Sequence, residues 1–184
     1  MATPLLVSFV GGDAGRWRVE RMAGVAGDGL PAVAALDVVE GRFVPGDGGA
    51  GGWVLRGVTS NERYVERPER AALVARQPAL GRAEATCAAL IPVRKSPAWW
   101  DLTQEERRAV LEDGSHHIAT GLEYLPAVAR RLHHGRDLGE EFDFLTWFEF
   151  APADASAFEE LVGRLRATEE WAYVDREVDI RLTR

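Results

Sequence analysis

Hydrophobic and polar positions follow regular spacings along much of this chain. Mostly hydrophobic runs at residues 5–10 and 53–58 predict two short strands in the N-terminal half. Residues 66–80 place Ala71, Leu73, Val74 and Gln77 at helical spacing, and residues 84–95 predict a strand with Pro92 near its end. The pattern from 53 to 95 therefore predicts a strand–helix–strand unit.

The C-terminal half repeats this pattern more regularly. Thr103 and Glu106 fit a capping box, and the helix that they begin is expected to run past Gly114 to about Tyr124, where Pro126 ends it. Residues 128–134 and 144–150 alternate at period two, which predicts a hairpin across a turn.

The remaining residues predict one more helix and a closing strand. The helix has a hydrophobic face of Phe158, Leu161, Val162 and Leu165, with Asp154 or Ser156 as its cap. The strand places its hydrophobic residues on one side, and these are Val174, Val178, Ile180 and Leu182.

The predicted order of the C-terminal half is β-α-β-β-α-β, as in ferredoxin-like units. The N-terminal half resembles a shorter and looser version of the same unit. Two such units predict an α+β fold in which the sheets pack together as a barrel. The glycine-rich segment 41–52 predicts a surface loop, because it carries no phosphate-binding pattern.

Charge and cysteine content exclude several classes of protein. The formal net charge is −7 and no cluster of Lys and Arg occurs, so we expect neither a nucleic-acid partner nor a membrane partner. An anionic substrate would need a local positive group. Cys87 is the only cysteine, which predicts no intrachain disulfide and favours a reducing, cytoplasmic location. No hydrophobic run reaches the roughly 20 residues of a membrane span.

Four histidines form two adjacent pairs, at 116–117 and 133–134. Neighbours on a helix point about 100° apart, so the first pair does not favour a zinc site. A helical histidine is more often a packing residue than a ligand. The Trp99–Trp100 pair and a carboxylate of the Glu169–Glu170 pair are candidates to accompany His117, although core packing and a solvated glutamate pair explain them as well.

Arg130 shares one face of its predicted strand with Val128 and Leu132. A buried arginine needs an anion or polar partners, so this position is a candidate anion site with Phe148 beside it. A salt bridge to Asp143 is an equally good interpretation of the sequence.

Several spaced blocks together resemble one family. These are residues 94–108 with Ser115-His116-His117, the later segments FDFLTWFE (142–149) and LRATEEWAYV (165–174), and the earlier segments 55–58 and 63–67. They are similar to the short-form chlorite dismutases. The likeness extends over nearly the whole chain and is weakest between residues 16 and 52.

The resemblance implies a role for each matching residue. His117 would be the proximal iron ligand of a non-covalent haem b, with Glu170 and Lys95 in its hydrogen-bond network. Arg130 would be the distal arginine, hydrogen-bonded by Gln77, with Phe148 as the distal aromatic residue. Three further residues would line the pocket or lie near the haem propionates, namely Trp99, Trp100 and Tyr64.

The family also implies an organisation and an activity. A single domain would span residues 1–184, with an N-terminal half of about 1–95 and a haem-binding half of about 96–184, in a homodimer of α+β barrels. The activity would convert chlorite to chloride and dioxygen. Coproheme decarboxylases, which lack the distal arginine, are the main alternative, and a haem carrier is another. The G-x-x-D-G motif of dye-decolorising peroxidases is absent.

Overall fold

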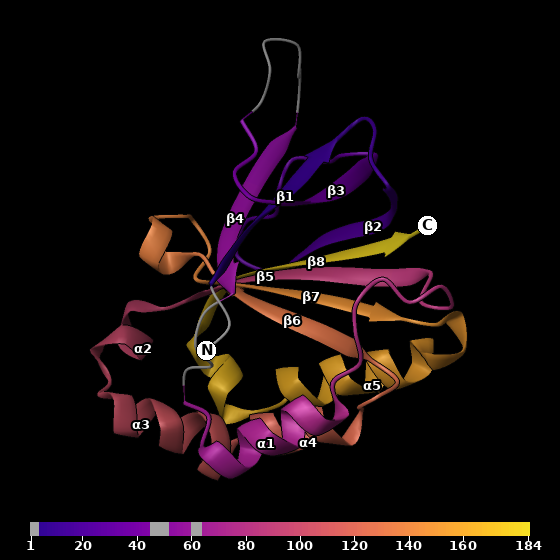
Figure 1. Cartoon of the computed structure of the whole chain (residues 1–184). Coiled ribbons are helices and arrows are strands. Elements are labelled where there is room, and N and C mark those ends of the chain that lie inside the picture. The colour runs from indigo at the N-terminus through magenta and orange to yellow at the C-terminus, as the bar shows by residue number, and fades with distance from the viewer. Residues whose placement is uncertain (1–3, 45–51, 60–63) are drawn as a thin grey trace.

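The strands of the protein close into a barrel in the order β1-β3-β2-β8-β5-β7-β6-β4, and every pairing is antiparallel (Figure 1). The computed structural model describes residues 4–44, 52–59 and 64–184. The strands are β1 (Leu5–Gly12), β2 (Trp17–Ala26), β3 (Ala35–Glu40), β4 (Trp53–Thr59), β5 (Cys87–Lys95), β6 (Ala129–His134), β7 (Phe144–Phe150) and β8 (Val174–Thr183).

The helices gather along the β5–β8 part of the barrel, on the lower side in Figure 1. They are α1 (Arg67–Arg76), α2 (Pro97–Asp101), α3 (Gln104–Arg108), α4 (His117–Glu123) and α5 (Ala155–Arg166). A π-helical turn occupies Ala109–Gly114, and short 3₁₀ turns occupy Arg136–Leu138, Pro152–Asp154 and Glu169–Tyr173. Among the described residues, no helix is long and apolar enough to cross a membrane.

Hydrophobic residues cover both faces of strand β5. Ala88 and Leu90 belong to a core cluster with Phe9, Trp147 and Ile180. The alternate residues Ala89, Ile91 and Val93 instead pack with the buried face of α5, formed by Phe158, Leu161, Val162 and Leu165. A strand that is buried on both faces is expected to be hydrophobic throughout rather than alternating. The sequence of β5 fits this rule.

The C-terminal order β-α-β-β-α-β is confirmed, and so is the β6–β7 hairpin. The N-terminal region supplies β1 to β4 with no helix between them in the described residues; the sequence predicted β1 and β4 but missed β2 and β3. Residues 45–51 of the predicted glycine-rich loop lie outside the described residues, and Gly41–Val44 has no regular structure.

The long helix predicted from Thr103 to Tyr124 is wrong in its middle. Its capping box is confirmed, because the Thr103 side chain accepts from the Glu106 N–H and the Glu106 carboxylate accepts from the Thr103 N–H. After Arg108, however, the chain continues as the π-helical turn, and His116 takes a left-handed conformation with φ 51°. His117 therefore begins a new helix, α4, and is not an interior helical residue.

Two smaller predictions are also corrected. Asp154 occupies the cap position of α5, but its side chain makes no capping hydrogen bond. Val174 packs with the cluster beneath α5, whereas Val178, Ile180 and Leu182 lie in the barrel core. The β5–β8 register shifts between Arg94 and Lys95, and this shift transfers Val174 to the other face.

Candidate active site

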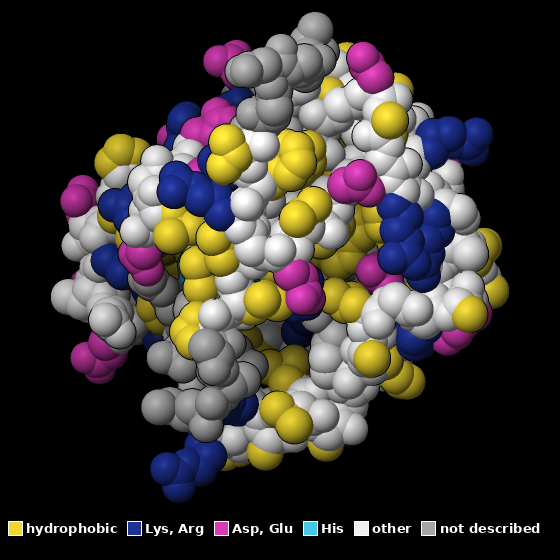
Figure 2. Space-filling model, turned by 45° about the horizontal axis from the view of Figure 1, so that its top comes forward, with side chains coloured by type: hydrophobic (Ala, Val, Ile, Leu, Met, Phe, Trp, Pro, Cys, Tyr) yellow, Lys and Arg dark blue, Asp and Glu magenta, His cyan; other side chains and the backbone are white. Residues whose placement is uncertain are grey.

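A cavity of about 730 Å³ lies between the helices and the strands β5, β6 and β7. Its volume falls within the range of ligand pockets in proteins. Apart from a few charged groups, its walls are apolar and include Leu73, Ile91, Val93, Leu111, Ile118, Leu132, Phe144, Phe148, Val162 and Leu165. On the face drawn in Figure 2, hydrophobic side chains gather around a hollow.

His117 reaches this cavity from the first turn of α4. Its ring nitrogen Nδ1 lies 2.6 Å from Oε2 of Glu170, and its side chain is 30% exposed. Because the carboxylate engages Nδ1, the other nitrogen, Nε2, remains for a ligand. A histidine that binds a metal through one nitrogen commonly donates the other N–H to a carboxylate in this way.

Glu170 is held from three directions. Its other oxygen, Oε1, forms a 2.7 Å ion pair with Nζ of Lys95, and its backbone N–H donates to Oγ of Ser115 at 3.0 Å. Burial opposes the ionisation of this carboxyl group. The charges of His117 and Lys95 and their hydrogen bonds outweigh burial and lower the pKa of Glu170 to about 2. The carboxylate is therefore anionic at neutral pH.

Lys95 is almost fully buried, with 3% of its side chain exposed. Its Nζ lies 4.6 Å from the ring centroid of Trp99 and 5.5 Å from that of Trp171, at distances typical of cation–π contacts. Burial lowers the pKa of Lys95, and Glu170 opposes that effect. Nε1 of Trp99 is buried with no hydrogen-bond partner among the described residues. A buried indole N–H usually has a partner, so this one is free for a polar ligand group.

Arg130 lines the same cavity and lies directly across the β6–β7 hairpin from Phe148. Within the described part of the chain, no hydrogen bond or ion pair involves its guanidinium. The sequence interpretation of a salt bridge to Asp143 is wrong, since Asp143 instead accepts from Arg136 and from the backbone of Lys95. Burial lowers the pKa of Arg130 to about 10, which still leaves it charged at neutral pH.

Gln77 and Tyr64 also line the cavity. The Gln77 amide donates to the backbone oxygen of Arg130 at 2.6 Å rather than contacting its guanidinium. The hydroxyl of Tyr64 accepts from Arg107 at 3.3 Å. Trp100 is absent from the lining and stacks on Phe144, which does line the cavity, with the Arg136 guanidinium 3.8 Å above its ring.

Sequence reasoning missed several residues that shape this site. Trp171 and Glu177 line the cavity, and Ser115 holds the backbone of Glu170. Gly121 gives the Arg130 guanidinium its space. Ser115 and Trp171 are sequence neighbours of predicted site residues, which is the one signal that could have marked them. Glu177 and Gly121 carry no such signal, because folding alone brings them to the cavity.

The described residues suit a non-covalent haem. An imidazole oriented by an anionic carboxylate, apolar walls and an unpaired guanidinium would provide an iron ligand, a binding cavity and an anion-binding group. The orphan indole N–H of Trp99 gives a further polar contact. Cys87 is not among the lining residues, so no thiol is available for a covalent link in the described wall.

Comparison with known proteins reveals clear relatives. Residues 46–184 match the model of the family described as chlorite dismutase. The chain is 37% identical over 84 residues to the chlorite dismutase of Ideonella dechloratans. That alignment covers 46% of this chain and only 27% of the relative, so the chain spans about a quarter of its length.

Solved structures extend the likeness to nearly the whole chain. The dimeric chlorite dismutase of Nitrobacter winogradskyi is 58% identical, with a TM-score of 0.88 over 97% of this chain and 99% of that one. The chlorite dismutase of Candidatus Nitrospira defluvii in complex with imidazole has a TM-score of 0.64 at 18% identity, over 98% of this chain and 91% of that one. The second likeness concerns the fold alone.

Proposed function

This chain belongs to the chlorite dismutase family, and from that membership we propose that it binds haem b at His117 and converts chlorite to chloride and dioxygen. The observation that carries the proposal is that one cavity is lined both by the His117–Glu170 pair and by the unpaired guanidinium of Arg130. In this reaction both Cl–O bonds break and one O–O bond forms. Chlorine is reduced and the oxygen atoms are oxidised, so no external reductant is needed.

His117 would hold the haem iron through Nε2, because Glu170 engages its other ring nitrogen. When bound, the haem would supply the redox chemistry of the reaction. The anionic Glu170, paired with Lys95, keeps the Nδ1 proton directed toward itself, which orients the ring and makes it a stronger donor. Trp99, Tyr64 and Phe148, which line the cavity, would surround the haem or its propionates, and Trp100 would support this wall through Phe144.

Arg130 would bind the anion. Because the net charge is −7, the protein as a whole does not attract chlorite, and a local cation must do so. The Arg130 guanidinium is half-buried, charged and free of carboxylate partners among the described residues, so its charge is available to a small oxyanion. Gln77 restrains the backbone at this position.

The decisive experiment measures oxygen release from chlorite by the haem-loaded protein and by two variants. We expect His117→Ala to lose stable haem binding. Arg130→Ala should keep the haem absorption spectrum but lose turnover or release hypochlorite, because no positive group would then hold the chlorine oxyanion in the cavity. An unchanged oxygen yield without trapped hypochlorite in Arg130→Ala would contradict the role of this arginine. Haem binding without oxygen release by the wild-type protein would favour a carrier.

We further propose a cytoplasmic homodimer. The Nitrobacter winogradskyi relative is dimeric, and nearly its full length aligns with this chain. The lone cysteine is consistent with a reducing compartment. Light scattering of the purified protein would test the dimer.

A further inference from the structure

The outer face of β8 carries charged residues where a hydrophobic strand face would be expected. Glu177, Asp179 and Arg181 lie beneath α5 and are 0%, 1% and 9% exposed, respectively. Buried charges are expensive unless they are paired, and a hydrophobic replacement is often as stable. Stability alone therefore does not explain these charges, and a role in positioning neighbouring residues is the alternative.

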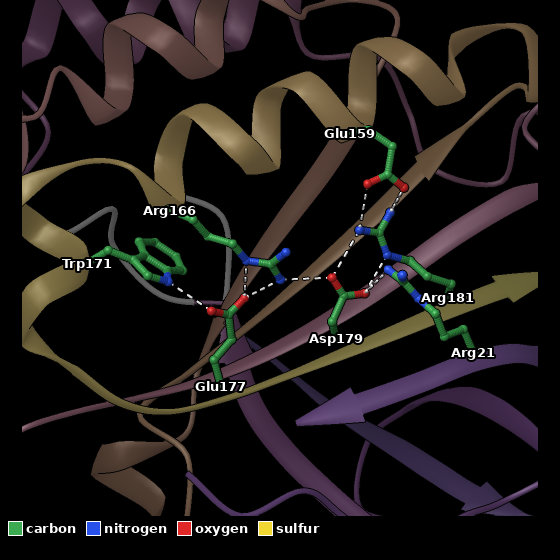
Figure 3. Close-up of polar contacts among 7 residues, drawn as sticks. All are labelled: Arg21, Glu159, Arg166, Trp171, Glu177, Asp179 and Arg181. Atoms are coloured by element: carbon green, nitrogen blue, oxygen red, sulfur yellow. Dashed lines mark hydrogen bonds and ion pairs between the residues drawn. The ribbon is translucent and has the colours of Figure 1, made fainter. Parts of the chain in front are cut away.

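These residues form one continuous network of ion pairs (Figure 3). Arg166, at the end of α5, donates to Glu177 at 2.8 Å and to Asp179 at 2.8 Å. Arg181 also binds Asp179 and continues to Glu159 at 2.6 Å. Asp179 is therefore surrounded by arginines, as it also faces Arg21 at 3.8 Å.

Glu177 differs from Asp179 in one respect. Its second oxygen, Oε2, accepts a 2.8 Å hydrogen bond from Nε1 of Trp171, a neutral donor in the 3₁₀ turn that carries Glu170. Figure 3 shows the Trp171 indole pointing from that turn toward Glu177 on β8. Both residues line the cavity of the candidate active site. The network therefore ends at the cavity wall on the Glu177 side.

Trp171 in turn lies against the residues that hold His117. Its ring centroid is 5.5 Å from Nζ of Lys95, which lies 4.6 Å from the Trp99 ring. The Lys95 ammonium is thus bordered by two indoles and by the Glu170 carboxylate. If the Trp171 ring turned away, water could reach this ion pair and weaken the restraint on Glu170.

We propose that Glu177 is a positioning residue for the haem ligand, acting through Trp171. Glu177 fixes the Trp171 indole, the indole shields the Lys95–Glu170 pair, and that pair orients His117. Arg166, at the end of α5, binds the other carboxylate oxygen of Glu177 and so holds this buried side chain in place. The inference rests on the proposed haem site, but its first step concerns contacts within the protein itself.

The first test uses the protein without haem. In ¹⁵N-labelled protein, the indole N–H signal of Trp171 is identified by its loss in Trp171→Phe. Hydrogen exchange of that N–H should become about tenfold faster in Glu177→Ala, because its acceptor is gone. Asp179→Asn is the matched control, since it also removes a carboxylate partner of Arg166 but does not touch Trp171. Exchange there should change less than about twofold.

The second test uses the protein loaded with hemin. We expect haem release to apomyoglobin to be about three to ten times faster in Glu177→Ala and in Trp171→Phe, and unchanged in Asp179→Asn. The iron–histidine stretching frequency should shift in the same two variants. The double variant should release haem no faster than the more affected single variant, because both changes break one link.

The outcomes separate this inference from the function that it rests on. Wild-type protein that binds no hemin would overturn the proposed haem site, whatever the indole exchange shows. Wild-type protein that binds hemin, with Glu177→Ala matching Asp179→Asn in both tests, would overturn the positioning role. If Glu177→Ala fails to fold, Trp171→Phe decides, since it removes the N–H donor and keeps a smaller aromatic ring at the same position.

Discussion

At the scale of single residues, the position of the Arg130 guanidinium depends on the absence of a side chain at Gly121. A Cβ built on Gly121 would lie 1.9 Å from Nη1 of Arg130, far inside van der Waals contact. The glycine is buried in α4, the same helix that begins with His117. One short helix therefore carries the candidate ligand and leaves room for the candidate anion-binding group.

Gly121→Ala should displace the guanidinium while the fold persists, because a flexible arginine can move. We expect normal hemin binding and a loss of chlorite turnover of about tenfold to a hundredfold, since small misplacements of a catalytic group have effects of this size. Oxygen release and hemin titration measure the two quantities.

Gly163→Ala is the matched control for that variant. Gly163 lies in α5 with open space around a built Cβ, so alanine there should leave turnover unchanged and stabilise the helix by about 0.5–1 kcal/mol. Equal turnover in Gly121→Ala and the wild-type protein would show that the position of this guanidinium does not limit the reaction.

At the scale of elements, the entry into α4 is organised by the preceding π-helical turn. Glu112, within that turn, accepts from the backbone N–H groups of Ile118 at 2.6 Å and Ala119 at 3.1 Å. These N–H groups lie in the first turn of α4, where no helical partner exists. Because His116 makes no side-chain cap, Glu112 performs that function from outside the helix.

Glu112→Ala should destabilise the protein by about 1 kcal/mol, the usual effect of losing a helix cap, and should weaken hemin binding because His117 begins this helix. Urea unfolding and hemin titration measure these effects. Asp113→Ala, at an exposed neighbouring position, should change neither. A similar loss in both variants would argue against a capping role.

At the scale of the whole molecule, the barrel interior contains a fully buried histidine. Nδ1 of His133 lies 3.1 Å from the Leu145 oxygen, and Nε2 accepts from Nε of Arg131 at 3.1 Å. Burial lowers the pKa of His133 to about 4. The hydrogen bond to Leu145 acts in the opposite direction, and the charge of Arg131 lowers the pKa slightly further. The folded protein therefore holds this ring neutral at pH values where the unfolded chain would protonate it.

This difference predicts a loss of stability on acidification. An unfolded histidine has a pKa of about 6.5, so between about pH 6.5 and pH 4 the unfolded state binds one more proton. The contribution of His133 is complete above that range and falls by up to about 3 kcal/mol across it. His133→Gln should flatten the pH dependence of the urea midpoint in this window, whereas His116→Gln, at an exposed position, should not. Parallel profiles for all three proteins would refute the assignment.

The sequence by itself determined the elements whose signals are local. The capping box at Thr103 and Glu106, the alternation of residues 144–150 and the hydrophobic face of α5 each depend on neighbours a few residues apart, and the structure confirms them. Spaced blocks of residues were also enough to identify the family.

The tertiary structure alone decided how the site is assembled. The predicted continuous helix breaks before His117, where Ser115 accepts from the backbone of Glu170 and Glu112 accepts from the backbone of Ile118. Hydrophobic periodicity carries no information about such side-chain contacts to the backbone. Arg130 lacks the Asp143 salt bridge because it pairs with Phe148, whereas Asp143 precedes Phe144 at the other end of the hairpin. Glu177 reaches Trp171 across the junction between the 3₁₀ turn and β8, while Arg166 of α5 binds its other oxygen. Such contacts join different elements, some neighbouring and some distant in the chain, so they form only when those elements have taken their places in the fold.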